Sequence, residues 1–172
     1  MVEDHVHEAC AGEVCVGDAA LAEHAAAEFL CPHAFVGHVR LVKEAVLELV
    51  LVGELVKPGQ VIGSCGPATS GRMDAYAPRL LDYGLKGMIG KGMRNEQVRS
   101  AMQQYGAVYF GAGGGAAALI ARSIEESRVL AYADLGTEAI HCFRVKNFPV
   151  IVLMDAHGGN LYATGPEAFR EE

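Results

Sequence analysis

The sequence predicts an α/β fold in which helices pack on a mixed sheet. The middle of the chain alternates short apolar segments with Gly-rich turns and helical segments, whereas its end reads as antiparallel strands. Hydrophobic residues make up 51% of the 172 residues, which is enough to bury a core. Glycine occurs 21 times, and this number indicates tight turns and close approaches of the backbone. We expect residues 1–172 to form a single domain.

The first third of the chain predicts a helix and then an apolar segment of undecided type. Asp18 suits the N-cap of an alanine-rich helix over 18–30, and Pro32 forbids its extension. Residues 46–52 are β-branched and leucine-rich. They form either a buried strand or the end of a helix that begins at Val39, because periodicity does not separate the two.

Strand–turn–helix units fill the middle of the chain. In order, we expect a turn at 57–60, a strand at 61–63, a Gly-rich turn at 66–71, a helix at about 73–83, a strand at 85–89, a helix after Asn95, a strand at 107–110, a Gly-rich turn at 111–115, a helix at 116–123 and a strand at 129–133. Pro78 fits the first turn of its helix, and Gly84 fits its C-terminal stop. The helix after Asn95 has an apolar face made of Val98, Ala101, Met102 and Tyr105.

The last quarter of the chain changes character. Residues 140–145 alternate between apolar and polar, and residues 150–154 are continuously apolar. Residues 155–160 read as a hairpin turn that leads into Leu161 and Tyr162. We therefore expect antiparallel strands at this end.

The charge distribution excludes one class of partner and locates the cations. The net charge of −7 argues against nucleic acid, because phosphate binding needs clustered Lys and Arg. Residues 1–56 contain ten acidic and two basic residues, whereas residues 57–172 contain eleven acidic and twelve basic residues. A site for an anion is therefore expected in the last two thirds of the chain.

The N-terminus and the cysteine usage indicate a cytoplasmic protein. The acidic N-terminus lacks a secretory pattern, and glutamates and a glycine interrupt the longest apolar stretches, so we expect neither a signal nor a membrane span. The odd count of five cysteines favours free thiols. His5 and His7 lie near Cys10 and Cys15, but this spacing is not that of a metal site, and we expect no metal on this chain.

The segment GPATSGRMD, which begins at Gly66, is the strongest candidate for binding an anion. Its small residues, including Gly66, Ser70 and Gly71, leave backbone N–H groups accessible, and Thr69 adds a hydroxyl. Arg72 can hold a carboxylate through two parallel hydrogen bonds, and the start of the expected helix favours negative charge. The alternative is an ordinary helix start with a Ser or Thr cap and a surface arginine.

Lys91 is a second candidate cation. It stands between two glycines at the end of a predicted strand, where open α/β sheets place their ligands. A lysine there can hold a second carboxylate or stabilise developing negative charge. The alternative is a solvated lysine in a loop.

A Gly-rich loop and one acidic residue complete the candidate site. Residues 111–116 follow a strand and fit the loose dinucleotide pattern GxGxxA, with Asp134 where a ribose ligand would lie. The antiparallel end leaves no room for further βαβ units. We therefore favour a loop, Gly114 included, that lets the backbone approach a small anion or a neighbouring subunit. Glu138 is either a helix-start carboxylate or a partner that orients one of the two cations.

Five motifs, taken in order, resemble the β part of the class I fumarases and L(+)-tartrate dehydratases. They are GPATSGRMD at 66–74, KGMIGKG at 86–92, GAGGGAAAL at 111–119, LGTEAI at 135–140 and FPVIVLMD at 148–155. The resemblance covers roughly residues 57–162, whereas residues 1–56 match poorly. Five ordered motifs with similar spacing are much more specific than any one of them.

The resemblance implies a swivelling β/β/α domain and the reversible addition of water to a small dicarboxylate, foremost fumarate to malate. It also implies an αβ hetero-oligomer, in which a partner α subunit carries a [4Fe-4S] cluster on three cysteines. The open iron position of that cluster acts as a Lewis acid. Arg72 and Lys91 match the substrate-carboxylate residues of the family. Thr69 lies in a threonine pair of which one hydroxyl contributes to proton transfer.

Two departures from the family pattern bear on function. The first threonine of the pair is Ala68 here, so the hydroxyl role either falls to Thr69 or is missing. In an N-terminal ARDAAH-like motif, Gly17 takes the place of a substrate-binding arginine and Leu21 that of the histidine. Either this region diverged or the site lost one cation. The alternatives to a fumarase subunit are an L-tartrate dehydratase subunit, a non-catalytic dicarboxylate-binding or assembly module, and nucleotide binding through the Gly-rich loop.

Overall fold

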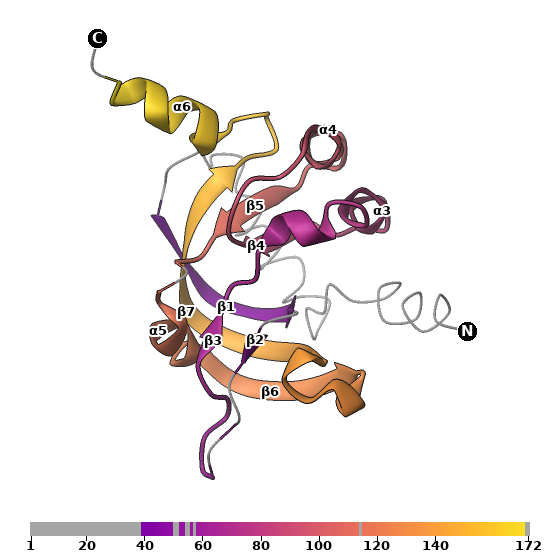
Figure 1. The fold of residues 1–172 in the computed structure, drawn as a ribbon, viewed down its shortest axis with the longest axis vertical. Helices are drawn as coiled ribbons and strands as arrows, with labels where there is room; N and C mark the ends of the chain where they lie inside the picture. Colours follow the sequence, from indigo (N-terminus) through magenta and orange to yellow (C-terminus); the bar gives the residue numbers. More distant parts are fainter. Residues whose placement is uncertain (1–38, 50–51, 54–55, 57, 114, 171–172) are drawn as a thin grey trace.

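The computed structural model describes residues 39–49, 52–53, 56, 58–113 and 115–170. Its elements, with η for 3₁₀ helices, are β1 (Val39–Leu49), β2 (Val52–Gly53), β3 (Cys65–Gly66), η1 (Ser70–Met73), α3 (Ala77–Asp82), β4 (Gly87–Gly90), α4 (Glu96–Tyr105), β5 (Val108–Gly111), α5 (Ala117–Ala121), β6 (Ile124–Ala131), η2 (Ala133–Glu138), β7 (Ile140–Met154) and α6 (Leu161–Ala168). They form a mixed open sheet with helices, which confirms the predicted α/β class (Figure 1). The helix expected at 18–30 lies outside the described residues.

The long strand β7 joins the two halves of the sheet. It pairs antiparallel with β1 from Val39 opposite Ile151 to Leu49 opposite His141. It also pairs antiparallel with β6 near its start and with β5 near its end (Figure 1). β4 and β5 are parallel and are connected through α4, as the predicted strand–turn–helix pattern requires.

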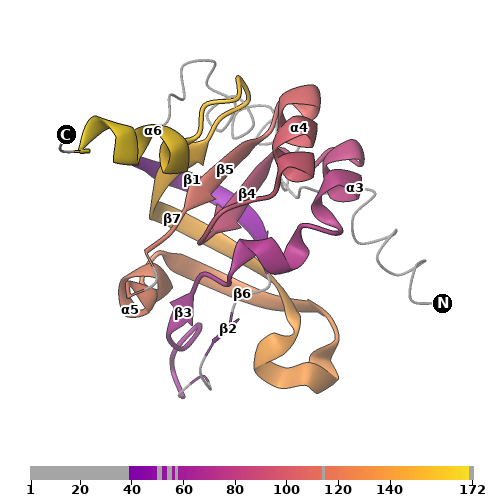
Figure 2. The same cartoon turned by 45° about the horizontal axis from the view of Figure 1, so that its top comes forward.

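The core has two parts, one on each face of β5. Val108 and Phe110 join a buried cluster that includes residues of β6, β7 and α5. Tyr109 points to the other face and joins a cluster with α3, α4 and the end of β7. Because successive side chains of a strand point to opposite faces, β5 is buried on both sides. α3 and α4 lie next to each other in both views (Figures 1 and 2).

Capping and stop signals in the sequence place several helices correctly. The Asn95 Oδ1 accepts a hydrogen bond from the Val98 N–H (2.9 Å), which caps α4 as predicted. Gly106 ends α4 with a φ of 66° in the left-handed region. Pro78 stands in the first turn of α3, and Gly84 follows it with a φ of +106°.

Three expected elements are wrong in place or type. No strand forms at 61–63, because the backbone that pairs with β2 is that of Cys65 and Gly66. The helix expected from residue 73 begins at Ala77, after the separate turn η1. Residues 161–162 begin helix α6 and not a strand, because the Asn160 Oδ1 accepts from the Tyr162 N–H (3.1 Å) and caps a helix.

Three other strands are longer than expected. Within the apolar segment of undecided type, residues 46–49 belong to strand β1, which begins at Val39, and Val52 begins β2. β6 begins at Ile124, which pairs with Val145 of β7. The two glutamates that follow Ile124 form exposed ion pairs with basic residues of β7. The two segments expected near the end are one strand, β7, which continues through Asn147 with a φ of 52°. Among the described helices, none has the length and apolar character needed to cross a membrane.

Candidate functional site

The predicted anion-binding segment and the predicted lysine lie side by side. The Ser70 N–H donates to the Lys91 carbonyl (3.0 Å), and the Lys91 N–H donates to the Ala68 carbonyl (3.2 Å). These bonds make residues 68–70 a short parallel addition at the end of β4. Arg72 follows within η1. We call Arg72 and Lys91, with the turns that carry them, the two-cation site.

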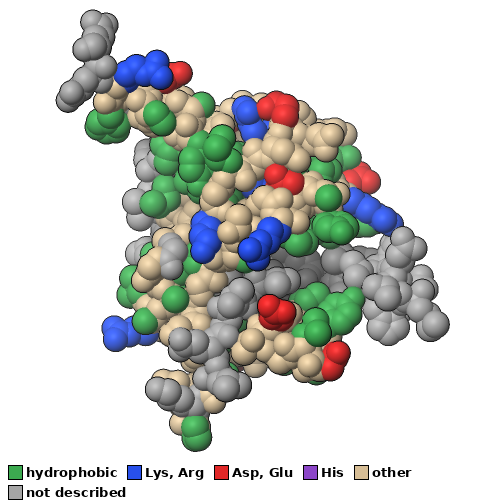
Figure 3. Space-filling view, in the orientation of Figure 1, with side chains coloured by type: hydrophobic (Ala, Val, Ile, Leu, Met, Phe, Trp, Pro, Cys, Tyr) green, Lys and Arg blue, Asp and Glu red, His purple; other side chains and the backbone are tan. Residues whose placement is uncertain are grey.

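The side chains of the two-cation site face solvent. Thr69, Arg72 and Lys91 are exposed, and within the described part of the chain no ion pair involves either cation. Asp74 does not neutralise Arg72, because its carboxylate accepts hydrogen bonds from Arg94 and from a backbone N–H. Figure 3 shows Lys and Arg side chains (blue) on this face, over β4 and η1. The site is therefore a positively charged surface that can accept carboxylates.

The expected helix start contributes less than predicted. η1 has four residues, and its N-cap, Thr69, makes no side-chain capping bond. A single 3₁₀ turn lacks the aligned peptides that give a helix its dipole, so the attraction for an anion rests on the charged side chains. Thr69 does not act as an ordinary cap either. The Thr69 side chain is exposed on the surface. Its methyl group lies 4.0 Å from the position that a Cβ on Gly92 would take.

Ser70 is buried under the site and makes internal contacts. Its Oγ hydrogen-bonds with the Tyr109 hydroxyl (3.0 Å), which also lies 2.9 Å from the Gly92 carbonyl oxygen. Burial raises the pKa of Tyr109, so its hydroxyl stays protonated at neutral pH. The predicted anion-binding segment thus includes a residue, Ser70, whose hydroxyl and N–H both hold the turn in place.

Gly90 is required by the buried position of Ser70. A Cβ on Gly90 would lie 1.8 Å from the Ser70 Oγ and 3.2 Å from its Cβ. Gly90→Ala should therefore lower the free energy of unfolding by about 1–3 kcal/mol, because it forces Ser70 away from Tyr109. Urea unfolding of G90A, S70G and G90A/S70G measures the effect. The double variant should be more stable than the sum of the single effects predicts, and strict additivity would contradict this packing.

Three other predicted site residues have separate positions. Gly66 ends β3, where a Cβ would lie 3.3 Å from the Ala117 Cβ, so the glycine permits the close approach of α5. Gly114 lies outside the described residues. Glu138 is the last residue of η2 and does not begin a helix, and among the described residues no ion pair joins it to either cation.

The Gly-rich loop after β5 does not continue as a dinucleotide unit. A Cβ on Gly111 would lie 2.5 Å from the Leu153 Cδ1, so close packing between β5 and β7 accounts for this glycine. α5 has five residues, and the strand that follows it, β6, pairs antiparallel with β7. A dinucleotide-binding unit instead returns to a parallel strand. The structure therefore argues against a dinucleotide site at this loop.

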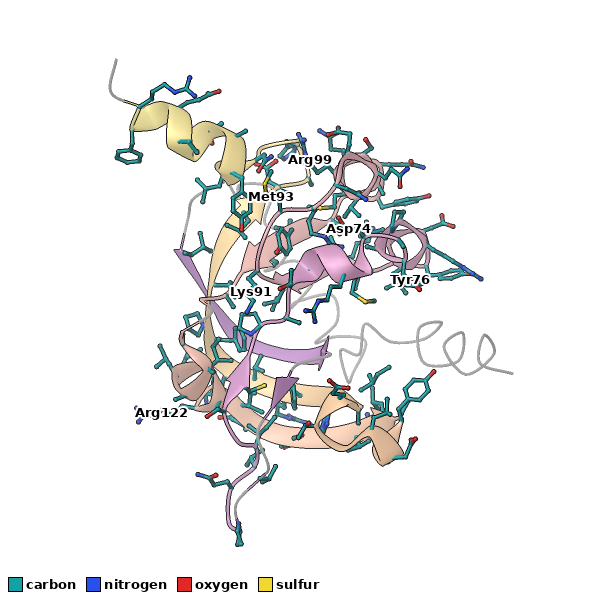
Figure 4. All side chains as sticks on the ribbon, viewed as in Figure 1. Asp74, Tyr76, Lys91, Met93, Arg99 and Arg122 are labelled. Carbon is teal, nitrogen blue, oxygen red and sulfur yellow. The ribbon has the colours of Figure 1, made fainter. Side chains whose placement is uncertain are left out.

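Sequence reasoning missed Arg94. This arginine is buried, its Nε donates to the Asp74 Oδ1 (2.6 Å), and its guanidinium lies 5.4 Å from the centre of the Tyr109 ring. The signal in the sequence is that a charged residue stands directly before the helix cap Asn95, on a turn that also carries Lys91. Figure 4 shows Asp74 and Lys91 on either side of η1.

The described residues do not fit a metal cluster. Within this part of the chain, no group of three His, Cys, Asp or Glu side chains could hold a metal ion. Cys65 and Cys142 are free and buried. Burial raises the pKa of the Cys65 thiol to about 11, whereas a cluster ligand is a thiolate. We therefore assign no reaction step to a cluster on these residues.

The raised pKa of Cys65 predicts a loss of stability at alkaline pH. The folded thiol keeps its proton above its usual value of 9.0, so the folded state binds more protons than the unfolded state between about pH 9 and 11. The stabilising contribution is complete below this window and is lost as the pH rises through it. Cys65→Ala should flatten the fall of the urea midpoint across the window, and Cys142→Ala should not. Equal slopes in all three proteins would contradict the assignment.

Most of the described residues lie in a region that matches a known protein family. The family model of the fumarase C-terminus matches residues 51–165. The anaerobic class I fumarate hydratase of Escherichia coli (strain K12) is 41% identical over 106 residues, which cover 60% of this chain and 19% of that protein. Fumarate hydratase 2 of Leishmania major is 37% identical over 107 residues, 61% of this chain and 19% of that protein.

A shorter relative is covered more fully. The putative L(+)-tartrate dehydratase subunit beta of Methanocaldococcus jannaschii is 36% identical over 111 residues, which cover 62% of this chain and 57% of that protein. The chain thus spans about a fifth of the length of the fumarate hydratases that it matches. The family match includes the two-cation site and the βαβ unit that supports it.

Proposed function

Because the chain belongs to the fumarase C-terminus family, we propose that it is the β component of a hydro-lyase that acts on a small dicarboxylate. The proposed reaction is the reversible addition of water to fumarate, which gives malate. The observation that carries this proposal is the pair of exposed cations, Arg72 and Lys91, held on adjacent turns by backbone hydrogen bonds. A four-carbon dicarboxylate presents one carboxylate to each.

The chemistry explains why two cations are needed. When malate loses water, a proton leaves the carbon next to a carboxylate, and negative charge develops on that carboxylate. A cation fixed in advance at this position stabilises the developing charge. Arg72 suits bidentate binding of one carboxylate, and Lys91 supplies a compact charge for the other. Thr69, exposed on the same surface, is our candidate for proton transfer, because Ala68 has no hydroxyl.

The exposure of the site supports the proposal that a partner subunit covers it. Thr69, Arg72 and Lys91 lie on an open surface, whereas hydro-lyase chemistry needs a site from which bulk water is excluded. Met73 and Met93, each next to a cation-bearing turn, are also exposed, at 44% and 63%. We propose that an α subunit covers this face in a cytoplasmic αβ hetero-oligomer. The [4Fe-4S] cluster of that subunit would supply a Lewis acid for the substrate hydroxyl.

Reconstitution tests the proposal. The chain is purified together with a candidate α subunit, iron and sulfide are restored without oxygen, and fumarate absorbance is followed. Loss of absorbance on addition of the complex supports the function. L-tartrate is assayed in parallel, because one relative bears the name of a tartrate dehydratase subunit. A brown, sulfide-containing chain isolated without any partner would contradict the location of the cluster.

A second candidate function is a non-catalytic dicarboxylate-binding module. Two departures from the family pattern favour it, namely Ala68 in the threonine pair and Gly17 in place of an arginine. This function predicts that fumarate or malate raises the melting temperature of the complex without turnover. Turnover that depends on Arg72 and Lys91 would remove this alternative.

A further inference from the structure

Asp74 and Arg94 form a buried ion pair next to the two-cation site. The Arg94 Nε donates to the Asp74 Oδ1 (2.6 Å), and the Asn95 N–H donates to the Asp74 Oδ2 (2.7 Å). Both members of the pair are less than a tenth exposed. Asp74 lies two residues after Arg72, and Arg94 lies three residues after Lys91. Each cation is therefore close in sequence to one half of the pair.

The pair closes a frame formed by residues 68–74 and 90–95. At one end, two backbone hydrogen bonds join residues 68–70 to Lys91. In the middle, a Cβ on Gly71 would lie 3.7 Å from the Met93 carbonyl oxygen, so the two turns run in contact. At the other end, the Asp74 carboxylate accepts hydrogen bonds from Arg94 and from the N–H of Asn95, the N-cap of α4. Figure 4 shows η1 between Lys91 and Asp74.

Stability alone is a weak explanation for this pair. Removing two charges from water costs about as much as their attraction returns, so buried pairs are seldom strongly stabilising compared with apolar side chains. The Arg94 Nη2 is buried without a hydrogen-bond partner among the described residues. Within the part of the chain that the structure describes, the Nη1 contacts the Met88 sulfur (3.2 Å), which is a weak acceptor. The two bonds to Asp74 are short and directional, so they fix geometry.

We propose that Asp74 and Arg94 are positioning residues, which hold Arg72 and Lys91 at the separation that the two carboxylates of the substrate require. The inference rests on the proposed function, because it takes a dicarboxylate as the ligand. Both members of the pair are buried, so they act through the frame and not by contact with substrate. Loosening the frame should weaken ligands that need both cations and spare ligands that need one.

The test compares two four-carbon inhibitors of the reconstituted complex, the dicarboxylate succinate and the monocarboxylate butyrate. Asp74→Asn keeps the shape of the side chain but removes its charge, and Arg94→Lys keeps the charge but removes the directional Nε bond. In each variant, the preference for succinate over butyrate should fall about tenfold, through weaker succinate binding. Butyrate inhibition should change by less than about threefold, because one cation suffices for it.

A matched control comes from the same helix. Glu96→Gln removes the exposed ion pair between Glu96 and Arg99 on α4, and it should leave the preference for succinate unchanged. Arg94→Lys keeps a cation opposite Asp74, so it provides folded protein if Asp74→Asn does not. An unchanged preference in the folded variants, or an equal loss for both inhibitors, would overturn the positioning role. A wild-type complex without any preference for succinate would instead contradict the proposed function.

Discussion

Replacing Lys91 by alanine is expected to lower kcat/KM for fumarate by about 10²–10³-fold in the reconstituted complex. Lys91 is exposed, and within the described residues it forms no ion pair, so its charge is available to a ligand. Arg72→Ala should have an effect of similar size, because the guanidinium holds the other carboxylate in this account. Steady-state rates from fumarate absorbance, across a range of fumarate concentrations, separate the effects on kcat and KM.

Two substitutions of other exposed cations serve as controls for the effect of removing a positive charge. Arg122→Ala removes an exposed arginine at the end of α5, which Figure 4 places away from Lys91 and η1. Lys146→Ala removes an exposed lysine of β7. Neither should change the rate by more than a factor of two or three, since they alter the net charge and, for Lys146, one exposed ion pair, but neither of the proposed carboxylate-binding cations. A rate within a factor of a few of wild type in both Lys91→Ala and Arg72→Ala would refute the assignment.

Asp74→Ala is expected to lower the free energy of unfolding by about 3–5 kcal/mol. The change leaves the buried Arg94 guanidinium without a counter-charge and the Asn95 N–H without its acceptor. Urea unfolding followed by far-ultraviolet circular dichroism measures the loss. The double variant D74A/R94M should recover part of it, because the uncompensated charge is then absent.

The exposed ion pair on α4 provides the comparison for Asp74. Arg99 and Glu96 pair at 2.7 Å, but their side chains are 37% and 75% exposed. Breaking this pair with Arg99→Ala should cost less than about 1 kcal/mol. If Asp74→Ala proved as mild as Arg99→Ala, the Asp74–Arg94 pair would not hold the two turns together.

Local signals in the sequence predict the parts of the fold that depend on neighbouring residues. Asn95 can accept a bond from the N–H three residues later, and Pro78 fits only an early helical position, so these predictions needed no tertiary information. The strand at Cys65 forms by pairing with β2, a separate segment of the chain, so local signals do not predict it. The helix after Asn160 was mistaken for a strand because a Gly-rich turn precedes both hairpins and capped helices.

The candidate site shows the same difference between features that local sequence predicts and features that depend on tertiary contacts. Arg72 and Lys91 were predicted from their positions in turns at strand ends, and the structure places those turns side by side. Ser70 was predicted as part of the anion-binding segment. Its orientation depends on a hydrogen bond with the Tyr109 hydroxyl, and the sequence does not reveal that contact. Arg94 was missed because a buried arginine and a surface arginine look alike until the partner, Asp74, is found beside it.

In the proposed function, this chain completes a hydro-lyase by supplying the two carboxylate-binding cations. The most direct measurement is the rate of fumarate loss by the cluster-loaded partner, without the chain, with the wild-type chain and with the double variant R72A/K91A. Turnover is expected with the wild-type chain only. Equal rates with the wild-type and double-variant chains, or full activity of the partner alone, would contradict it.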